Sequence, residues 1–344
     1  MLTTIKPSNL HVHLRRGLML RLVLPFTVRQ FRYATVMPNT NPGIYTAEDV
    51  ITYRQEILEE LDRLREQDGV DYKFSPIMVL YITPQTTPEM VEAAYAAGAI
   101  AGKLYPKDGT TNSADGIKYY WPLYPVFKKM EELGMRLLIH GEIVRYENQV
   151  RSLVFLPILE EIANMFPRLF IVLEHIPNYE GVEAVMRHDN VAGTISLHHL
   201  LETETTVMGH KFLTHHNWKP KVQMEHDRER LCWAATSGRA DFFNGNDSAP
   251  HPRGDKEAAE CGAGGFSEPV TMPRLAQLFE ERNALHNLEG FASIHGPQWY
   301  GLPVDTEEKL TLVKEDWTVP SVYTLEDLEV VPYLRGQTMR WKVA

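Results

Sequence analysis

The feature that most constrains the fold of this chain is a regular alternation of strand-like and helix-like segments along its 344 residues. Eight apolar runs are expected to be strands: 9–14, 33–37, 74–82, 99–104, 135–140, 169–175, 191–197 and 240–244. Helical patterns cover 46–67, 87–97, 121–133, 150–165, 179–187, 225–237 and 272–283. This order predicts an α/β protein and favours a closed (β/α)8 TIM barrel. An open doubly wound sheet is the weaker alternative, because no glycine-rich dinucleotide fingerprint follows the first strand.

The chain is expected to form a single domain over residues 1–344. The part from about residue 295 to 344 is rich in proline, and we expect it to be a C-terminal extension packed on the barrel. Three connections are long, at 105–115, 198–221 and 247–269. In a barrel the loops that follow the strands form the catalytic face, so these long loops are expected to be functional.

Composition excludes several kinds of partner. The net charge of −10 argues against a nucleic acid or an anionic membrane surface. No segment is apolar over a membrane-spanning length, since the run 18–26 is short and is interrupted by Arg21 and Pro25. The N-terminus has no signal-peptide pattern. Only two cysteines are present, Cys232 and Cys261, which makes a disulfide framework unexpected and a cytoplasmic location the default.

His11 and His13 are the first candidate site residues. Side chains at i and i+2 of a strand point to the same side, so the two imidazoles are expected side by side, with Arg15 following. An incidental pair is the competing interpretation, because a lone H-x-H motif is not specific. The motif gains weight from ligand-type residues at the ends of later strands.

Those residues are Lys103, His140, His175 and Asp247. Each has an ordinary alternative taken singly: a packing histidine, a helix-capping aspartate, or a lysine that reaches water. The carboxyl ends of barrel strands meet at one mouth, so a metal centre accounts for all of them together. An ammonium group cannot bind a metal, but a lysine that has reacted with CO2 becomes an N-carboxylate, which can bridge two cations.

Several motifs carry a resemblance that covers essentially the whole chain. It resembles the dihydroorotase family of the amidohydrolase superfamily, most closely the shorter, monofunctional type. The segments that carry the likeness are His11-Val-His13, Met37-Pro-Asn39, Gly102-Lys-Leu-Tyr-Pro106, Thr110-Thr-Asn-Ser113, His140-Gly-Glu142, Leu173-Glu-His175, Asp247-Ser-Ala-Pro-His251 and Gly296-Pro-Gln-Trp-Tyr-Gly-Leu-Pro303.

The resemblance implies a barrel that holds two zinc ions, bridged by a carboxylated Lys103 and a hydroxide. His11, His13, Lys103 and Asp247 would hold the more buried ion, and Lys103, His140 and His175 the more exposed one. The implied reaction is the reversible hydrolysis of (S)-dihydroorotate to N-carbamoyl-L-aspartate, the third step of pyrimidine (UMP) biosynthesis. The hydroxide would attack the ring carbonyl, with Asp247 as general base and then general acid.

The resemblance also implies a substrate site and a homodimer. Arg15, Asn39 and His251 would bind the substrate carboxylate, and Ala263 and Lys219 would contact its ring through the backbone. Lys219 depends on a loose match of Trp218-Lys-Pro220 to a Cys-x-Pro pattern. Thr110 and Thr111 would belong to a mobile loop that closes over the substrate.

Some segments depart from the family pattern. Residues 143–153 lack the expected acidic stretch, and Asn244-Gly-Asn246 replaces a Leu/Phe-Gly-Thr/Ser run. The histidine pairs at 198–199 and 215–216 have no assigned role and are expected mostly to be surface or packing residues. Two functional alternatives stay open: another cyclic-amide hydrolase of the hydantoinase kind, and a catalytically inactive structural homologue.

Overall fold

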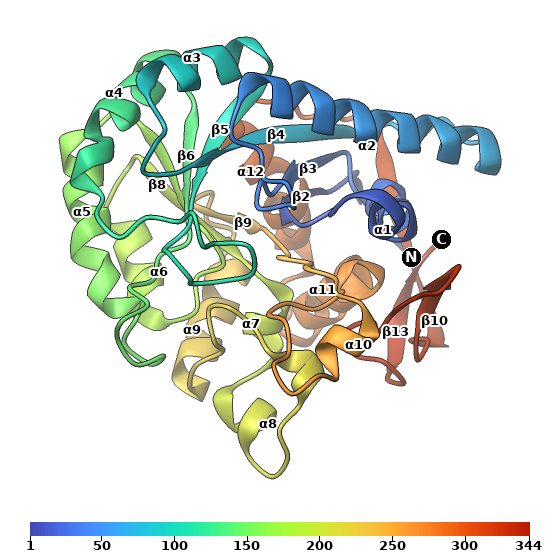
Figure 1. Cartoon of the computed structure of the whole chain (residues 1–344). Helices are drawn as coiled ribbons and strands as arrows, with labels where there is room; N and C mark the ends of the chain where they lie inside the picture. Colours follow the sequence, from blue (N-terminus) through green and yellow to red (C-terminus); the bar gives the residue numbers. More distant parts are fainter.

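The computed structural model describes all 344 residues and has a barrel of parallel strands at its centre (Figure 1). Eight strands pair in chain order: β2 (Ser8–Val12), β3 (Tyr33–Val36), β4 (Ser75–Ile82), β5 (Ala99–Leu104), β6 (Arg136–Ile139), β7 (Phe170–Leu173), β8 (Val191–Ile195) and β9 (Phe242–Asn244). Beyond β9, Ser248 bridges to Val12 of β2, which brings the two edges of the sheet together. The predicted barrel is confirmed, and the open sheet is wrong.

The helices lie around the strands as an outer ring (Figure 1). They are α1 (Gly17–Gln30), α2 (Ala47–Asp68), α3 (Pro88–Ala96), α4 (Tyr124–Leu133), α5 (Leu156–Met165), α6 (Tyr179–Met186), α9 (Glu225–Thr236) and α11 (Thr271–Glu281). Local sequence sets several of their ends. Thr46 and Asp49 form a capping box at the start of α2, and Gly69 adopts φ 66° at its end.

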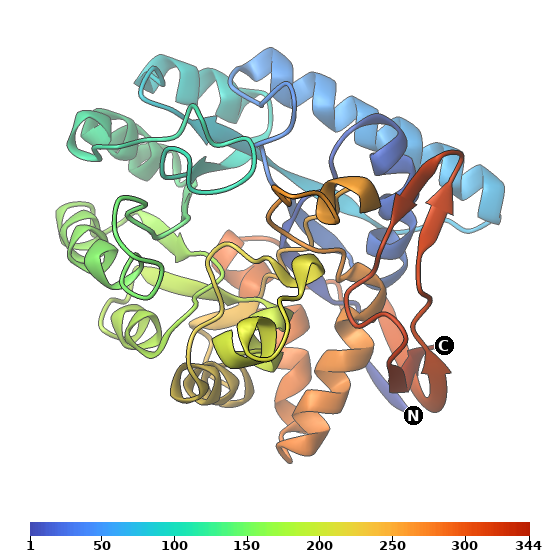
Figure 2. The ribbon, with the colours of Figure 1, turned by 60° about the horizontal axis from the view of Figure 1, so that its bottom comes forward.

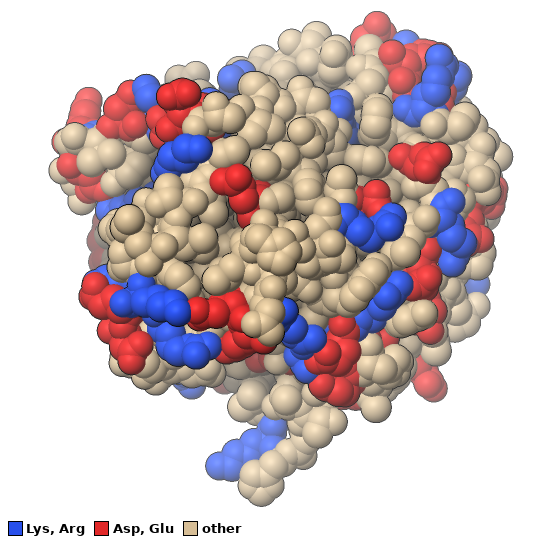
Figure 3. Space-filling view, turned by 180° about the vertical axis from the view of Figure 1, so that it is seen from behind, with Lys and Arg blue, Asp and Glu red and all other residues tan.

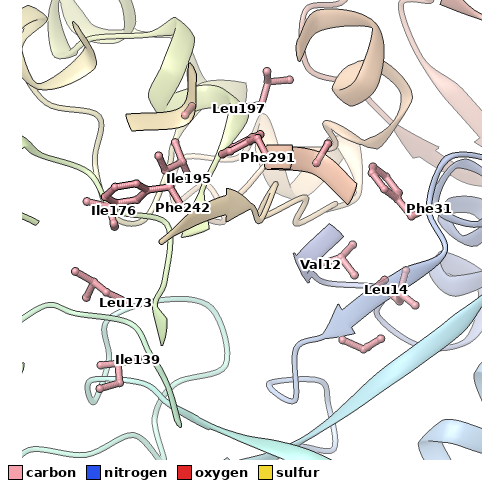
Figure 4. Packing of buried hydrophobic residues seen from close by; sticks show 14 of the residues in the cluster. Val12, Leu14, Phe31, Ile139, Leu173, Ile176, Ile195, Leu197, Phe242 and Phe291 are labelled. Carbon is pink, nitrogen blue, oxygen red and sulfur yellow. The ribbon is translucent and has the colours of Figure 1, made fainter. Parts of the chain in front are cut away.

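Two apolar layers hold the barrel together. The outer layer fills the space between strands and helices, and includes Val12, Leu173 and Phe242 (Figure 4). The inner layer fills the barrel itself, and includes Leu10, Ala101, Leu138, Val172 and Phe243. Adjacent residues of one strand therefore belong to different layers, as the period of two requires. This assignment of faces decides which side chains reach the mouth of the barrel.

Helix α1 is absent from our predictions, because its apolar run carries Pro25 and was considered only as a membrane segment. The proline is accommodated inside the helix. The connection 198–221 is also not a plain loop: it overlaps α7 (Leu197–Leu201) and contains α8 (Glu204–Met208). None of the helices combines the length and apolar composition needed to cross a bilayer.

The C-terminal extension packs on the barrel, as predicted. It starts with α12 (His295–Tyr300), which contacts β2 and β9. It continues into β10 (Lys309–Thr318) and β13 (Thr338–Val343), which form an antiparallel sheet with the N-terminal strand β1 (Leu2–Ile5) at one side of the barrel (Figure 2). Two short strands, β11 (Tyr323–Leu325) and β12 (Leu328–Val330), form a separate hairpin. The chain termini therefore lie close together.

Charged side chains are mixed on the face opposite to the view of Figure 1. Lysines and arginines alternate there with acidic residues around a broad uncharged centre (Figure 3). On this face no extended basic patch accompanies the negative net charge.

Candidate active site

Strand β2, the first strand of the barrel, places two imidazoles at the barrel mouth by means of an irregularity in its pairing. Leu10 lies in the inner layer and Val12 in the outer one, although two residues apart in a regular strand share a face. The pairing of β2 with β3 shifts register between Asn9 and Val12, as in a β-bulge. Bulges re-aim side chains and are frequent beside active sites. Here the bulge brings His11 and His13 beside Asp247.

Three further side chains follow the inner face by simple alternation. Lys103 lies two residues after Ala101, His140 two after Leu138, and Glu174 two after Val172. All three are buried at the carboxyl ends of adjacent strands, and Lys103 has no exposed surface at all. The strand pattern thus places a lysine, a histidine and a glutamate around the same mouth.

His175 and Asp247 reach the mouth by leaving the strand geometry. Both have left-handed backbone conformations, with φ of 40° and 51°. The N–H of His175 donates to Thr194 Oγ1 at 2.7 Å, and the N–H of Asp247 donates to the carbonyl of His11 at 2.9 Å. Non-glycine residues seldom adopt this conformation, and where they do the site is often functional.

The predicted ligands converge. Asp247 Oδ1 lies 3.2 Å from Nε2 of both His11 and His13. The ring of His175 lies 4.9 Å from that of His11 and 4.6 Å from that of His140, between centroids. Ligand atoms of His11, His175 and Asp247 all lie within 4.8 Å of one another. Lys103 also belongs to this group, because its Nζ lies 3.9 Å from the Glu174 carboxylate that contacts His11. The structure therefore brings the six predicted ligands together.

The protonation of His13, His175 and Asp247 suits cation binding, while burial opposes a charge on His11 but the Glu174 and Asp247 carboxylates raise its pKa. Burial lowers the pKa of His13 to about 3 and also lowers the pKa of His175, so both rings are neutral near pH 7. Burial opposes ionisation of Asp247, but His11 and His13 hold the pKa of its carboxyl well below the usual range. Burial lowers the pKa of Lys103 to about 8, against the charges of Glu174 and Asp247. Neutral imidazoles and an ionised carboxylate are the forms that bind metals.

Sequence reasoning missed two carboxylates that orient the ligands. Glu174 contacts His11 Nδ1, and Glu142 Oε2 lies 2.5 Å from His140 Nε2. In each ring the other nitrogen remains for the centre, and such carboxylate–histidine pairs commonly support metal ligands. Strand alternation could have indicated Glu174, because Glu174 lies two residues after Val172 and therefore shares the inner face of the barrel with it. For Glu142 there was no comparable signal, since it follows the end of β6.

A small cavity adjoins the cluster and contains most of the predicted substrate residues. It is lined by His13, Arg15, Asn39, Thr110, Thr111, Lys219, Asp247, Ala249, Ala263 and Gly264. His13 and Asp247 belong to both the ligand cluster and the cavity. A molecule bound there therefore touches the candidate metal ligands directly.

The loop with Thr110 and Thr111 lies across this cavity. Thr111 Oγ1 donates to the carbonyl of Ala263 at 3.3 Å, and Asn39 Nδ2 donates to the carbonyl of Thr111 at 2.8 Å. Tyr105 in turn donates to Asn39 Oδ1 at 2.9 Å. Asn39 therefore joins the loop to the barrel as well as lining the cavity.

His251 is the one predicted substrate residue that does not line the cavity. Its Nε2 lies 2.7 Å from the carbonyl of Ala263, which only accepts, so Nε2 carries the proton. Arg15 Nη2, also a donor, is then a neighbour at 3.3 Å and not a hydrogen-bond partner. Arg15 Nε donates to the carbonyl of Pro250 at 3.1 Å. The remaining N–H groups of the guanidinium are left for a ligand.

The unassigned histidines have packing contacts. His198 and His199 are buried, and the ring of His198 stacks on Trp218 at 4.1 Å between centroids. His215 and His216 are partly exposed and pair with Glu257 and Glu202. None of the four lines the cavity.

Comparison with known proteins identifies relatives of the whole chain. No family model matches the chain. A dihydroorotase of Teredinibacter turnerae is 40% identical over 347 residues, which cover 99% of this chain and 98% of that protein. The crystal structure of a dihydroorotase from Campylobacter jejuni superposes with a TM-score of 0.90 at 35% identity, covering 99% of this chain and 97% of that one.

A more distant neighbour shares the fold alone. The L-hydantoinase of Arthrobacter aurescens superposes with a TM-score of 0.79 at 14% identity, covering 99% of this chain and 83% of that one. The barrel is thus common to both kinds of enzyme, and sequence identity over the full length separates them.

Proposed function

The chain belongs to the dihydroorotase family, enzymes that hydrolyse a cyclic amide, and we propose that its ligand cluster holds two zinc ions and opens the ring of (S)-dihydroorotate reversibly to N-carbamoyl-L-aspartate. The observation that carries the proposal is the sharing of His13 and Asp247 between the ligand cluster and a cavity that also contains Arg15. A carboxylate-bearing ring bound by Arg15 would thereby be presented to the cluster.

The donor set fits such ions. Four histidines and an aspartate are the nitrogen and oxygen ligands that zinc accepts. Lys103 Nζ is fully buried without any hydrogen-bond partner, which suits a group that is chemically modified before it serves as a ligand. We propose that an N-carboxylated Lys103 bridges the ions, with His11, His13 and Asp247 on one side and His140 and His175 on the other. When bound, the ions would polarise the ring carbonyl and lower the pKa of water.

Asp247 is the proposed proton carrier. Its Oδ1 faces two imidazoles, and its second oxygen makes no hydrogen bond within the protein. During hydrolysis the water oxygen bonds to the ring carbonyl carbon while its proton moves to Asp247. The amide C–N bond then breaks, and Asp247 delivers the proton to the departing ring nitrogen. Ring closure follows the same path in reverse.

Arg15 is the proposed group for substrate selection. Its unengaged N–H groups can bind a carboxylate through two parallel hydrogen bonds. Asn39 lines the same cavity. His251 lies outside the cavity and hydrogen-bonds to the carbonyl of Ala263, which lines it. Lys219 and Ala263 are proposed to contact the ring. Hydantoin and dihydrouracil lack the carboxylate, so they would lose this anchor.

The experiment compares turnover of dihydroorotate, hydantoin and dihydrouracil by the zinc-loaded protein and its Arg15→Met variant. We expect wild-type turnover of dihydroorotate only. Removing one partner of a buried charged pair costs about 2–5 kcal/mol, so R15M should lower kcat/KM roughly 30-fold to 5000-fold. Arg253→Met, at an exposed arginine outside the cavity, is the matched control. Zinc-loaded protein without ring-opening activity contradicts the proposal, as does preferred turnover of hydantoin.

Location and assembly are also proposed. Cys232 and Cys261 are both free thiols, which suits the reducing cytoplasm. We propose a homodimer. Size-exclusion chromatography with multi-angle light scattering tests it, and twice the chain mass of 39.4 kDa is expected.

A further inference from the structure

The barrel closes between β2 and the chain after β9, and both side-chain and backbone hydrogen bonds join the two sides of this seam. Asn244 Nδ2 donates to the carbonyl of Ser8 at 2.9 Å, and the backbone of Asp247 donates to that of His11. The candidate ligands His11 and Asp247 stand on opposite sides of the seam. Whatever fixes the seam therefore fixes the separation of these two ligands.

Asn9 is the central residue of the seam. Its Oδ1 accepts from the backbone N–H of His11 at 3.3 Å and from that of Asn246 at 2.9 Å. Both contacts require the carbonyl oxygen of the amide to face the seam. If the amide were flipped, its NH2 group would face two N–H donors, and neither would have an acceptor. The orientation of the Asn9 amide must therefore be held from its other end.

Glu268 provides that hold. Asn9 Nδ2 donates to Glu268 Oε1 at 2.6 Å, and the Glu268 side chain is buried, with the residue only 1% exposed. Its second oxygen has no hydrogen-bond partner. Burial raises the pKa of Glu268 to about 8, which favours the neutral carboxyl near pH 7. A buried carboxyl that reaches neither the cavity nor the cluster serves no step of the proposed reaction.

The geometry points to Glu268 as a positioning residue that orients Asn9 and thereby sets His11 and Asp247 at the separation needed for metal binding. This inference rests on the metal centre proposed above. It also gives a role to Asn244, in the segment 244–246 that departs from the family pattern, because the Asn244 side chain bonds to Ser8 across the seam, while Asn246 bonds to Asn9 through its backbone N–H.

The test is zinc affinity of the full-length protein, measured by competition with a chromophoric chelator, together with thermal unfolding of the metal-free form. Glu268→Gln keeps an acceptor for Asn9, and Glu268→Met keeps volume without one. We expect E268Q to bind zinc within about threefold of wild type and E268M to bind it about 10-fold to 100-fold more weakly, the usual effect of losing a ligand-supporting partner.

Gln30→Met is the matched control. Gln30 Nε2 donates to the backbone carbonyl of Glu268 at 2.7 Å, so this variant loses a buried hydrogen bond at the same place without freeing Asn9. We expect Q30M to unfold at lower temperature but to bind zinc like wild type. If E268M does not fold, Asn9→Ala replaces it, with the same expected loss of zinc affinity.

Wild-type zinc affinity in E268M or N9A overturns the inference, and so does an equal loss in E268Q and E268M. A wild-type protein that binds no zinc contradicts the proposed function instead, which keeps the two failures distinct.

Discussion

The backbone N–H of Asp247 donates a 2.9 Å hydrogen bond to the carbonyl of His11, joining two candidate metal ligands that are far apart in the sequence. Their side chains also meet, with Asp247 Oδ1 at 3.2 Å from His11 Nε2. The bond holds the two residues in register whether or not an ion is present. The site is therefore built into the closure of the barrel, and substitutions there are expected to act on chemistry more than on folding.

Asp247→Asn tests the proton-carrying role. The amide retains the shape and an oxygen ligand but cannot accept and return a proton. General acid–base groups contribute about 10²-fold to 10⁴-fold, so we expect kcat to fall by at least about 10². Steady-state kinetics with measured zinc content checks this. Asp255→Asn, at an exposed position in the same loop, should behave like wild type. An active D247N variant would exclude Asp247 as the proton carrier.

Thr111→Val tests loop closure. The substitution keeps the shape of the side chain but removes the hydroxyl that donates to Ala263. One hydrogen bond is worth about 0.5–1.5 kcal/mol, so kcat/KM should fall roughly 2-fold to 12-fold with little change in thermal stability. Thr205→Val, at an exposed threonine of α8, is the control. Unchanged kinetics in T111V would mean that the hydroxyl plays no part in closing the loop.

Glu268 is expected to make stability pH-dependent. Its pKa is about 8 when folded and near 4.5 when exposed, so the folded state binds the proton more tightly. The contribution to stability is complete below pH 4.5 and is lost as pH rises towards 8. At pH 7 the loss approaches about 3 kcal/mol.

Metal-free E268Q, which cannot ionise, should therefore gain stability relative to wild type as pH rises from 5 to 8. Urea unfolding of both proteins at several pH values measures the difference. A constant difference across this range would show that Glu268 does not titrate there.

The two thiols should differ in reactivity. Burial raises the pKa of Cys232 to about 11, and its thiol donates to the carbonyl of Leu200 at 3.4 Å. Cys261 is partly exposed. Because the thiolate is the reactive form, Cys232 at pH 8 should react with a thiol reagent about 10²-fold more slowly than an unperturbed cysteine. Stopped-flow labelling of C232S and C261S assigns the phases, and comparable rates would contradict the burial of Cys232.

Local sequence determined the barrel and most positions around its mouth. Strand and helix periods are properties of short segments, so the eight strands could be located from runs such as 99–104 and 169–175. Chain order then brought Lys103, His140 and His175 to one end, because parallel strands expose their carboxyl ends together. Two segments had helices that were not predicted: α1 carries a helix-breaking proline, and the helices of the 198–221 connection are too short to show a clear period.

Only the tertiary structure decided which distant segments and side chains meet. The pairing of β1 with β10 joins residues about 300 positions apart, as between Leu2 and Leu312, and no local pattern encodes that contact. The same holds for Asn9 with Glu268 and for His11 with Glu174. These contacts depend on which side chains meet once the sheet has curved round on itself. That curvature follows from the packing of all strands and helices together and not from any one segment.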